Sequence, residues 1–191
     1  MVAGAGLIIL LMAVKKIELE EVMKEVEITL LIFFMSLFII VGGVEGSQFL
    51  EYLGQFIVPF IQSDLLMATI VLMWVAAVMS AAIDNIPFTA AMIPILLSLE
   101  TQGINTSPLW WSLALGVGMG GNGTHIGSTA NVYIVTVSER LAKKEGNPDL
   151  AITPLKWMKI GLPIMLLTLC ICSIIMFFFF DFYSQPIPRT M

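Results

Sequence analysis

Apolar residues fill most of the chain, and the polar positions that interrupt them divide it into predicted helices. Residues 2–14 and 28–44 are apolar runs, and residues 15–27 between them carry eight charges, which predicts an amphipathic cytoplasmic connector. Residues 45–63 place bulky apolar side chains at near-helical spacing and predict a helix at the membrane interface. Because the run 28–44 approaches the length of a bilayer crossing and similar runs follow it, the pattern predicts a polytopic, all-α integral membrane protein.

Residues 64–99 predict a helical hairpin that enters the bilayer and returns to the same side. An apolar helix is expected over residues 65–83, and the residues Asp-Asn-Ile-Pro at 84–87 end it. Pro87 lacks an amide hydrogen and biases the preceding residue away from helical geometry. The second arm is expected over residues 88–99, about 18 Å of helix, which is too short to cross the hydrocarbon core alone.

A second interruption lies in the glycine-rich, polar stretch 120–131. A helix predicted over residues 108–144 begins at a proline, which suits a first helical position, and breaks at this stretch. Irregular backbone at membrane depth persists only where protein buries it or where it lines a wet cavity. The stretch therefore predicts a binding site in a discontinuous helix, and a final span is expected over residues 160–180.

Basic residues suggest how the spans are oriented. Apart from Arg189 near the C-terminus, they lie in the regions 15–24 and 140–159 and are absent from residues 45–63 and 100–107. By the positive-inside tendency, the basic loops are cytoplasmic in a multi-pass protein of the plasma (inner) membrane. A single crossing by residues 64–99 would put a loop without basic residues on the cytoplasmic side, so the hairpin is favoured while that alternative stays open.

Composition excludes several functional classes. The chain is 58% hydrophobic and 12% charged with a formal net charge of -5, and no basic run or aromatic platform suggests a nucleic-acid partner. No nucleophile stands beside a base, so enzymatic chemistry is not expected. The lone histidine offers no metal-ligand cluster, and no cofactor is expected beyond Na⁺ or H⁺ as a coupling ion.

Asp84 is the one carboxylate between Asp64 and Glu100. An ionised, unpaired carboxylate at membrane depth costs several kcal/mol, so this group should be protonated, paired or bound to a cation. It is therefore the natural proton or sodium site of a transporter. Alternatively, it caps the second arm by accepting hydrogen bonds from backbone amides near Phe88, and both roles can hold together.

Neutral amides and hydroxyls supply the other polar groups of the two breaks. His125 titrates near neutrality when it is exposed, which makes it a candidate proton relay, although a hydrogen-bonded structural histidine is favoured. The neutral donors and acceptors are Asn85, Asn122, Thr124, Ser128, Thr129 and Asn131.

The sequence AIDNIPFTAAMIP at 82–94, followed by LWWSLALG at 109–116 and the stretch 120–131, resembles the second half of the ion transporter superfamily. The resemblance is closest to the arsenite permease and P protein group, with citrate and sodium/proton carriers as wider relatives. It implies one half of an inverted-repeat transporter, with a re-entrant hairpin and a broken helix. His125 departs from the apolar residue usual there. The implied substrate or ion contacts, with Na⁺ near Asp84 and Asn122, are Asp84, Asn85, Thr89, Asn122, Gly123, Thr124, Ser128 and Asn131.

The resemblance implies secondary transport of a small ion, coupled to protons or sodium. The ion is an anion such as arsenite, citrate or a dicarboxylate, or Na⁺ exchanged for H⁺. Only one half of such a carrier is present, so we expect a fragment whose partners are the lipid bilayer, the small ion, a missing N-terminal half and a second copy in a homodimer. The alternatives are an ion channel whose breaks form a selectivity filter and a non-transporting membrane fragment.

Overall fold

The structure is a computed structural model of the 191-residue chain. It describes residues 58–186 continuously and, before them, only positions 32, 35, 36, 39, 40, 42, 43, 46, 47 and 52. The chain divides into two compact units, residues 1–39 and 40–191. The described positions of the first unit are helical and exposed. The predicted connector 15–27 lies outside the described residues, as does the run 2–14 and most of the span 28–44.

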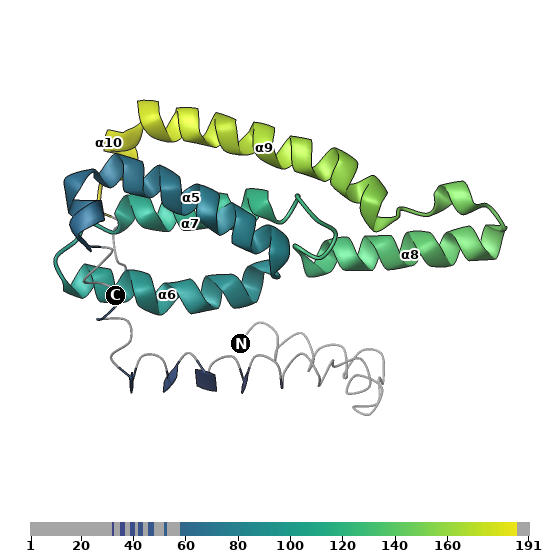
Figure 1. Cartoon of the computed structure of the whole chain (residues 1–191), viewed down its shortest axis with the longest axis horizontal. Helices are drawn as coiled ribbons and strands as arrows, with labels where there is room; N and C mark the ends of the chain where they lie inside the picture. Colours follow the sequence, from purple (N-terminus) through teal and green to yellow (C-terminus); the bar gives the residue numbers. More distant parts are fainter. Residues whose placement is uncertain are drawn as a thin grey trace, which may run out of the picture. The chain divides into compact units, whose positions relative to one another are not determined.

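All regular elements of the described part are helices, in agreement with the predicted all-α fold. In the second unit α5 and α6 run antiparallel, α7 runs alongside α5, α8 continues in the direction of α7, and α9 runs back (Figure 1). The elements are α5 (Leu65–Ala82), α6 (Asn85–Thr101), α7 (Ser107–Gly120), α8 (Thr129–Glu145), the 3₁₀ helix η1 (Pro148–Leu150), α9 (Pro154–Phe178) and α10 (Phe180–Tyr183).

Small residues of α7 pack against the backbone of α5. The hydroxyl of Ser112 donates to a main-chain carbonyl of α5 that lies 43 positions earlier, at 2.5 Å. A Cβ placed on Gly116 or Gly120 would lie 2.4 or 2.3 Å from a carbonyl oxygen of α5. Such residues let helix backbones approach closely inside a membrane, so α5 and α7 form one tightly packed pair. The facing residues are Thr69 and Ser112, Met73 and Gly116, and Ala77 and Gly120.

The second arm of the hairpin is longer than its sequence predicts. Helix α6 begins at Asn85, three residues before the predicted start, because the Asp84 carboxylate accepts a hydrogen bond from the Ile86 amide at 3.1 Å. Pro87 falls in the first turn, where a helix needs no amide donor. With 17 residues, α6 spans about 26 Å rather than 18 Å. The predicted start of the arm is therefore wrong, but a helix of about 26 Å is still shorter than the hydrocarbon core of roughly 30 Å, so its length does not contradict a re-entrant arm.

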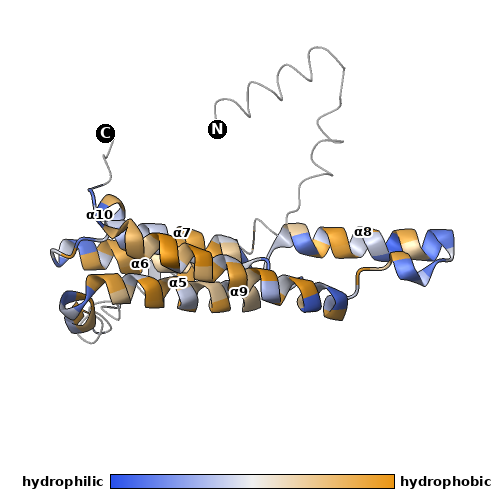
Figure 2. Ribbon diagram, turned by 90° about the horizontal axis from the view of Figure 1, so that it is seen from above, coloured by the Kyte–Doolittle hydropathy of each residue, from blue (hydrophilic) through white to orange (hydrophobic). Residues whose placement is uncertain are grey.

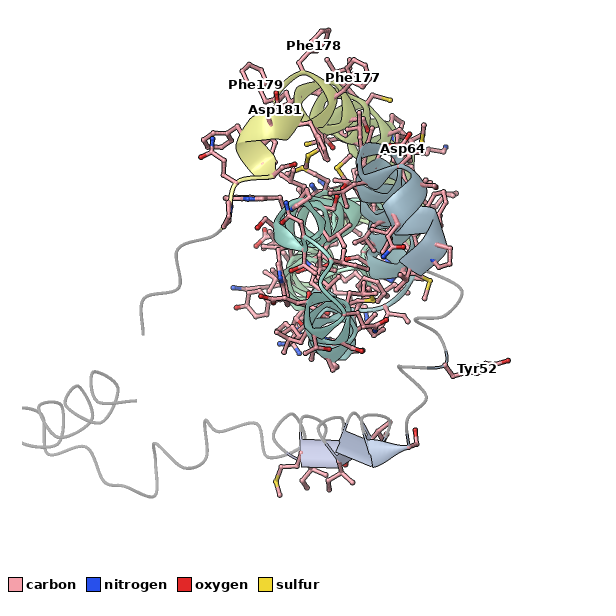
Figure 3. The ribbon with its side chains drawn as sticks, turned by 90° about the vertical axis from the view of Figure 1, so that its left-hand side faces the viewer. Tyr52, Asp64, Phe177, Phe178, Phe179 and Asp181 are labelled. Carbon is pink, nitrogen blue, oxygen red and sulfur yellow. The ribbon has the colours of Figure 1, made fainter. Side chains whose placement is uncertain are left out.

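Helix α9 also begins earlier than the predicted span 160–180. The hydroxyl of Thr153 accepts from the amide of Lys156 at 3.2 Å, and Pro154 occupies the first helical position. In the described part, Leu65–Ala82 and the stretch Pro148–Phe178, which includes α9, are long and apolar enough to cross a membrane. At the far end of α9, three phenylalanines, Phe177, Phe178 and Phe179, project from the bundle (Figure 3).

Polar residues mark the end of α8 that lies farthest from α5, α6 and α7. Figure 2 shows apolar residues over α5, α6 and most of α9, and hydrophilic residues where α8 ends, at η1 and at the start of α9. Helix α8 ends at Gly146, whose φ of +63° is the left-handed conformation that glycine adopts readily. Lys143 and Lys144 lie in its last turn, where positive charge complements the helix dipole.

Candidate functional site

The turn between α5 and α6 and the first residue of α6, together residues 83–85, contact the irregular segment between α7 and α8, residues 121–128. We call these the tip and the break. One oxygen of the Asp84 carboxylate accepts from the hydroxyl of Thr129, the first residue of α8, at 2.6 Å. Its other oxygen accepts from the Ile86 amide in the first turn of α6. The half-buried carboxylate thus lies at two helix N-termini, whose aligned peptide dipoles favour negative charge.

Asn85, the other polar residue of the tip, packs into the end of the α5–α7 pair. Its side-chain oxygen contacts the hydroxyl of Ser80, which donates to the carbonyl of Val117 at 3.0 Å. Because a hydroxyl carries one proton, exchanging the amide oxygen and nitrogen of Asn85 lets the amide donate to Ser80 and satisfies all three groups. A Cβ on Gly121 would lie 2.9 Å from the amide atoms of Asn85, so glycine permits this approach.

Side chains of the break and of α8 satisfy much of its irregular backbone. The hydroxyl of Thr124 donates to the carbonyl of Ala81 at 2.5 Å and accepts from the amide of Gly127 at 3.0 Å. The side-chain amide of Asn131 donates to the carbonyls of Gly121 and Thr124, at 2.7 and 3.2 Å. Buried main-chain groups need such partners where water is excluded, so these contacts let the chain leave the helix inside the protein.

The start of α9 borders the break on another side. The indole nitrogen of Trp157 donates to the carbonyl oxygen of Asn122 at 3.1 Å. Gly123 is buried, and a Cβ there would lie 2.5 Å from the sulfur of Met165. The break is therefore bordered by α5, by α9 and by the tip.

The structure brings five of the predicted contacts to this junction: Asp84, Asn85, Gly123, Thr124 and Asn131. The other three lie differently. The hydroxyl of Thr89 donates to the carbonyl of Asn85 within its own helix, at 2.8 Å. Ser128 precedes α8 without capping it by a side-chain hydrogen bond, and the side chain of Asn122 is exposed.

His125 lies in the break but is not the hydrogen-bonded residue that its sequence favours. Its Nδ1 atom is buried, and it has no hydrogen-bond partner among the described residues. Over the same part of the chain, no group of three or more histidine, cysteine, aspartate or glutamate side chains is placed to hold a metal ion. The proton-relay role of His125 stays a prediction.

Three residues at the junction are absent from the predicted contact set. Ser80 carries a hydroxyl four positions before Asp84, near the end of an apolar helix. That spacing places it one helical turn before the tip and could have identified it as a contact from the sequence. Thr129 is one of several neutral donors in the sequence, and only the fold shows that it meets the carboxylate. Trp157 lies 35 positions beyond Asn122, and no local pattern connects the two.

The junction offers hydroxyls, amides, one carboxylate and the start of two helices, but no nucleophile paired with a base. Such a set can bind a small ion reversibly. No lysine or arginine of the described residues forms an ion pair with Asp84, so charge there is balanced by dipoles and hydrogen bonds.

The family described as "Citrate transporter" matches residues 1–116, a segment that includes the tip and ends before the break. The chain is 39% identical to the P protein of Sus scrofa over 147 residues, which are 73% of this chain and 17% of that protein. It is 33% identical to a 46 kDa membrane protein of Mycobacterium leprae over 148 residues, 76% of this chain and 33% of that protein.

An uncharacterized transporter of Synechocystis sp. is 29% identical over 189 residues, 90% of this chain and 40% of that protein. The chain thus spans well under half the length of each of these relatives. No solved structure matches the chain.

Proposed function

The chain belongs to the citrate transporter family, and from that premise we propose that it forms part of a membrane carrier for a small ion. The ion binds where the tip meets the break. Relatives whose names describe transporters support this assignment. Because the residues at 82–94 and 120–131 resemble the second half of such carriers, we assign the chain to the C-terminal half, with the N-terminal half completing the site.

One observation carries the proposal, namely the direct contact between the two irregular segments. The hydrogen bond from Thr129 to Asp84 joins tip to break, and the hydroxyl of Thr124 bonds to the last turn of α5. Because Ala77 faces Gly120, the last residue of α7, the end of α5 runs past α7 and lies beside the break, and α8 continues beyond it (Figure 1). This arrangement supports a re-entrant hairpin and a broken helix that expose helix ends near the bilayer midplane.

The helix ends favour an anion such as arsenite, citrate or another dicarboxylate. The first turns of α6 and α8 both start at the junction, where their main-chain amides and dipoles attract negative charge. No side chain caps the first turn of α8, and although the amide of Asn131 bonds to the Ser128 carbonyl at 3.0 Å, those of Thr129 and Ala130 are available to a ligand. A negatively charged substrate would accept hydrogen bonds from the main-chain amides of the break and from the side-chain amides beside it.

The carboxylate of Asp84 favours a second candidate, exchange of Na⁺ for H⁺. It is the acidic group of the junction, and a proton or a sodium ion there would neutralise it at membrane depth. The same site would serve as the coupling site of an anion carrier, with Na⁺ held by oxygens of the tip and of the break near Asn122.

Flux measurements on the full-length protein in liposomes test the proposal. We expect saturable uptake of radiolabelled citrate, arsenite or sodium that follows an imposed proton or sodium gradient. Replacing Thr129 by valine removes the tip-to-break hydrogen bond and should raise the KM by about tenfold, the effect of one hydrogen bond. Thr136→Val is the matched control, because Thr136 bonds only to the carbonyl of Val132 in its own helix, at 2.9 Å.

Other outcomes would contradict the proposal. Large unitary currents without saturation would identify a channel. Folded protein that moves none of the three ions under either gradient would indicate a non-transporting membrane protein.

A further inference from the structure

The first turns of α9 hold one peptide of the break in place. The indole N–H of Trp157 donates to the carbonyl oxygen of Asn122 at 3.1 Å. One turn later, a Cβ on the buried Gly161 would lie 2.3 Å from the same oxygen. Any larger residue at position 161 would push the helix away from the carbonyl. Two positions on one face of α9 therefore fix the Asn122 peptide.

The next turn of α9 continues this contact. Met165 is 5% exposed, packs in a core cluster with Ala81 and Leu169, and its sulfur touches the position of Gly123. The residues of α9 that face the break recur every four positions, which places them on one side of the helix. The break is thus clamped between α9 and the end of α5, and its backbone has little freedom at residues 122 and 123.

Trp157 bonds to the main-chain carbonyl of Asn122 and not to its side chain. That side chain is exposed and makes no hydrogen bond with the described residues. Asn122 lines a cavity of about 490 Å³ together with Asp149, Lys156 and Trp157 and with apolar residues of α9. A free amide at the wall of a cavity beside the break is available to a solute that enters there.

We propose that Trp157 is a positioning residue for transport: it holds the Asn122 peptide so that the side-chain amide of Asn122 faces the ion's path. This inference rests on the proposed function. A glycine-rich segment has many accessible backbone conformations, and ordering it costs entropy at each residue. Trp157 and Gly161 select one of these conformations before the ion arrives, so the ion does not have to order the segment on binding.

The test compares two indole donors in the full-length protein. Trp157→Phe removes the N–H that bonds to the break, and Trp74→Phe removes one that bonds to the hydroxyl of Ser173 on α9 at 2.9 Å, away from the break. Both variants lose one indole hydrogen bond that involves α9. Gly161→Ala displaces the same peptide while keeping both indoles.

We expect Trp157→Phe to raise the KM for the transported probe, among citrate, arsenite and sodium, by about tenfold with the maximal rate within about twofold. Amide hydrogen exchange over residues 121–128 should rise about fivefold or more, because the peptide is no longer fixed. Gly161→Ala should change both quantities in the same direction. Trp74→Phe should change neither.

A wild-type KM in Trp157→Phe, or an equal change in Trp74→Phe, would overturn the inference. If the wild-type protein moves none of the three probes, the proposed function fails. The exchange measurement then decides separately whether Trp157 fixes the break, and unchanged exchange over residues 121–128 would refute it.

Discussion

The two irregular segments of the site are stabilised in different ways. The tip is short, with Ile83 in extended geometry and Asp84 capping the helix that follows by a bond to an amide two residues away. The break is eight residues long, and its backbone is held by Asn131 from α8, by Trp157 from α9 and by a bond from Thr124 to α5. The tip is largely a local structure, whereas the break depends on tertiary contacts.

This difference predicts that the tip is rigid and that the break can change its conformation. A turn capped by its own side chain keeps its shape when its surroundings change, because the bond spans only a few residues. A glycine-rich segment held by three other helices changes shape when any of them moves. We therefore expect the tip to keep its shape when a neighbouring helix moves, and the break to shift with α5, α8 or α9.

Gly120→Ala should have the largest effect on stability. The new Cβ would lie 2.3 Å from the carbonyl oxygen of Ala77, and because both atoms belong to packed helices, α5 and α7 must separate at the start of the break. We expect a loss of about 3 kcal/mol in the free energy of unfolding, measured by reversible denaturation in mixed micelles. The matched control is Gly118→Ala on the same helix, where a Cβ meets nothing within 4 Å and alanine favours helix. Equal loss in both variants would show that the close packing of α5 and α7 does not support the break.

Asn131→Leu tests whether the break depends on α8. Leucine keeps a similar volume but donates no hydrogen bond, so the buried carbonyl of Gly121 loses its partner. The carbonyl of Thr124, which also accepts from Asn131, keeps a hydrogen bond from the amide of Gly127 at 3.4 Å. The expected loss is about 2 kcal/mol, with faster hydrogen exchange over residues 121–128. Wild-type stability would mean that the break satisfies its own backbone.

Asp84→Ala should cost less, because the tip is short and its cap is a single side chain. Loss of the bonds to Ile86 and Thr129 is expected to lower stability by about 1 kcal/mol. Asp84→Asn keeps one oxygen to accept from the Ile86 amide and places an NH2 group at Thr129, whose hydroxyl can accept instead of donate, so its stability should stay within about 0.5 kcal/mol of wild type. Flux in that variant separates the two roles of the carboxylate: lost coupling to the gradient identifies an ion site, and unchanged transport leaves only the cap.

Local chemistry explains why sequence reasoning located both interruptions. Glycines and polar residues at 120–131 favour irregular backbone, so α7 ends and α8 begins inside the predicted stretch, and the cap and proline at 84–87 start a new helix after the first arm. Helix starts were placed less well. Capping by Asp84 and Thr153 begins α6 and α9 earlier than apolar patterning indicates, because a cap and a proline act on the first turn regardless of hydrophobicity.

The contacts across the site are beyond what one sequence gives. Ser80 meets Val117 only because α5 and α7 pack side by side, and no feature of the sequence specifies that pairing. Trp157 bonds to a residue 35 positions away, for the same reason. Residue types near a break indicate which groups are available, while the packing of α5, α7 and α9 decides which of them meet.

Ser128→Ala should have the smallest effect, and it contrasts most directly with the tip. Ser128 stands at the cap position of α8, where a serine usually contributes about 1 kcal/mol, yet its side chain makes no cap bond here. The variant should therefore unfold within about 0.5 kcal/mol of wild type, as for an exposed substitution. If Ser128 contacts the ion instead, the KM rises while stability is unchanged. A loss near 1 kcal/mol with unaltered KM would show that α8 is capped as α6 is, and that the break holds its shape locally after all.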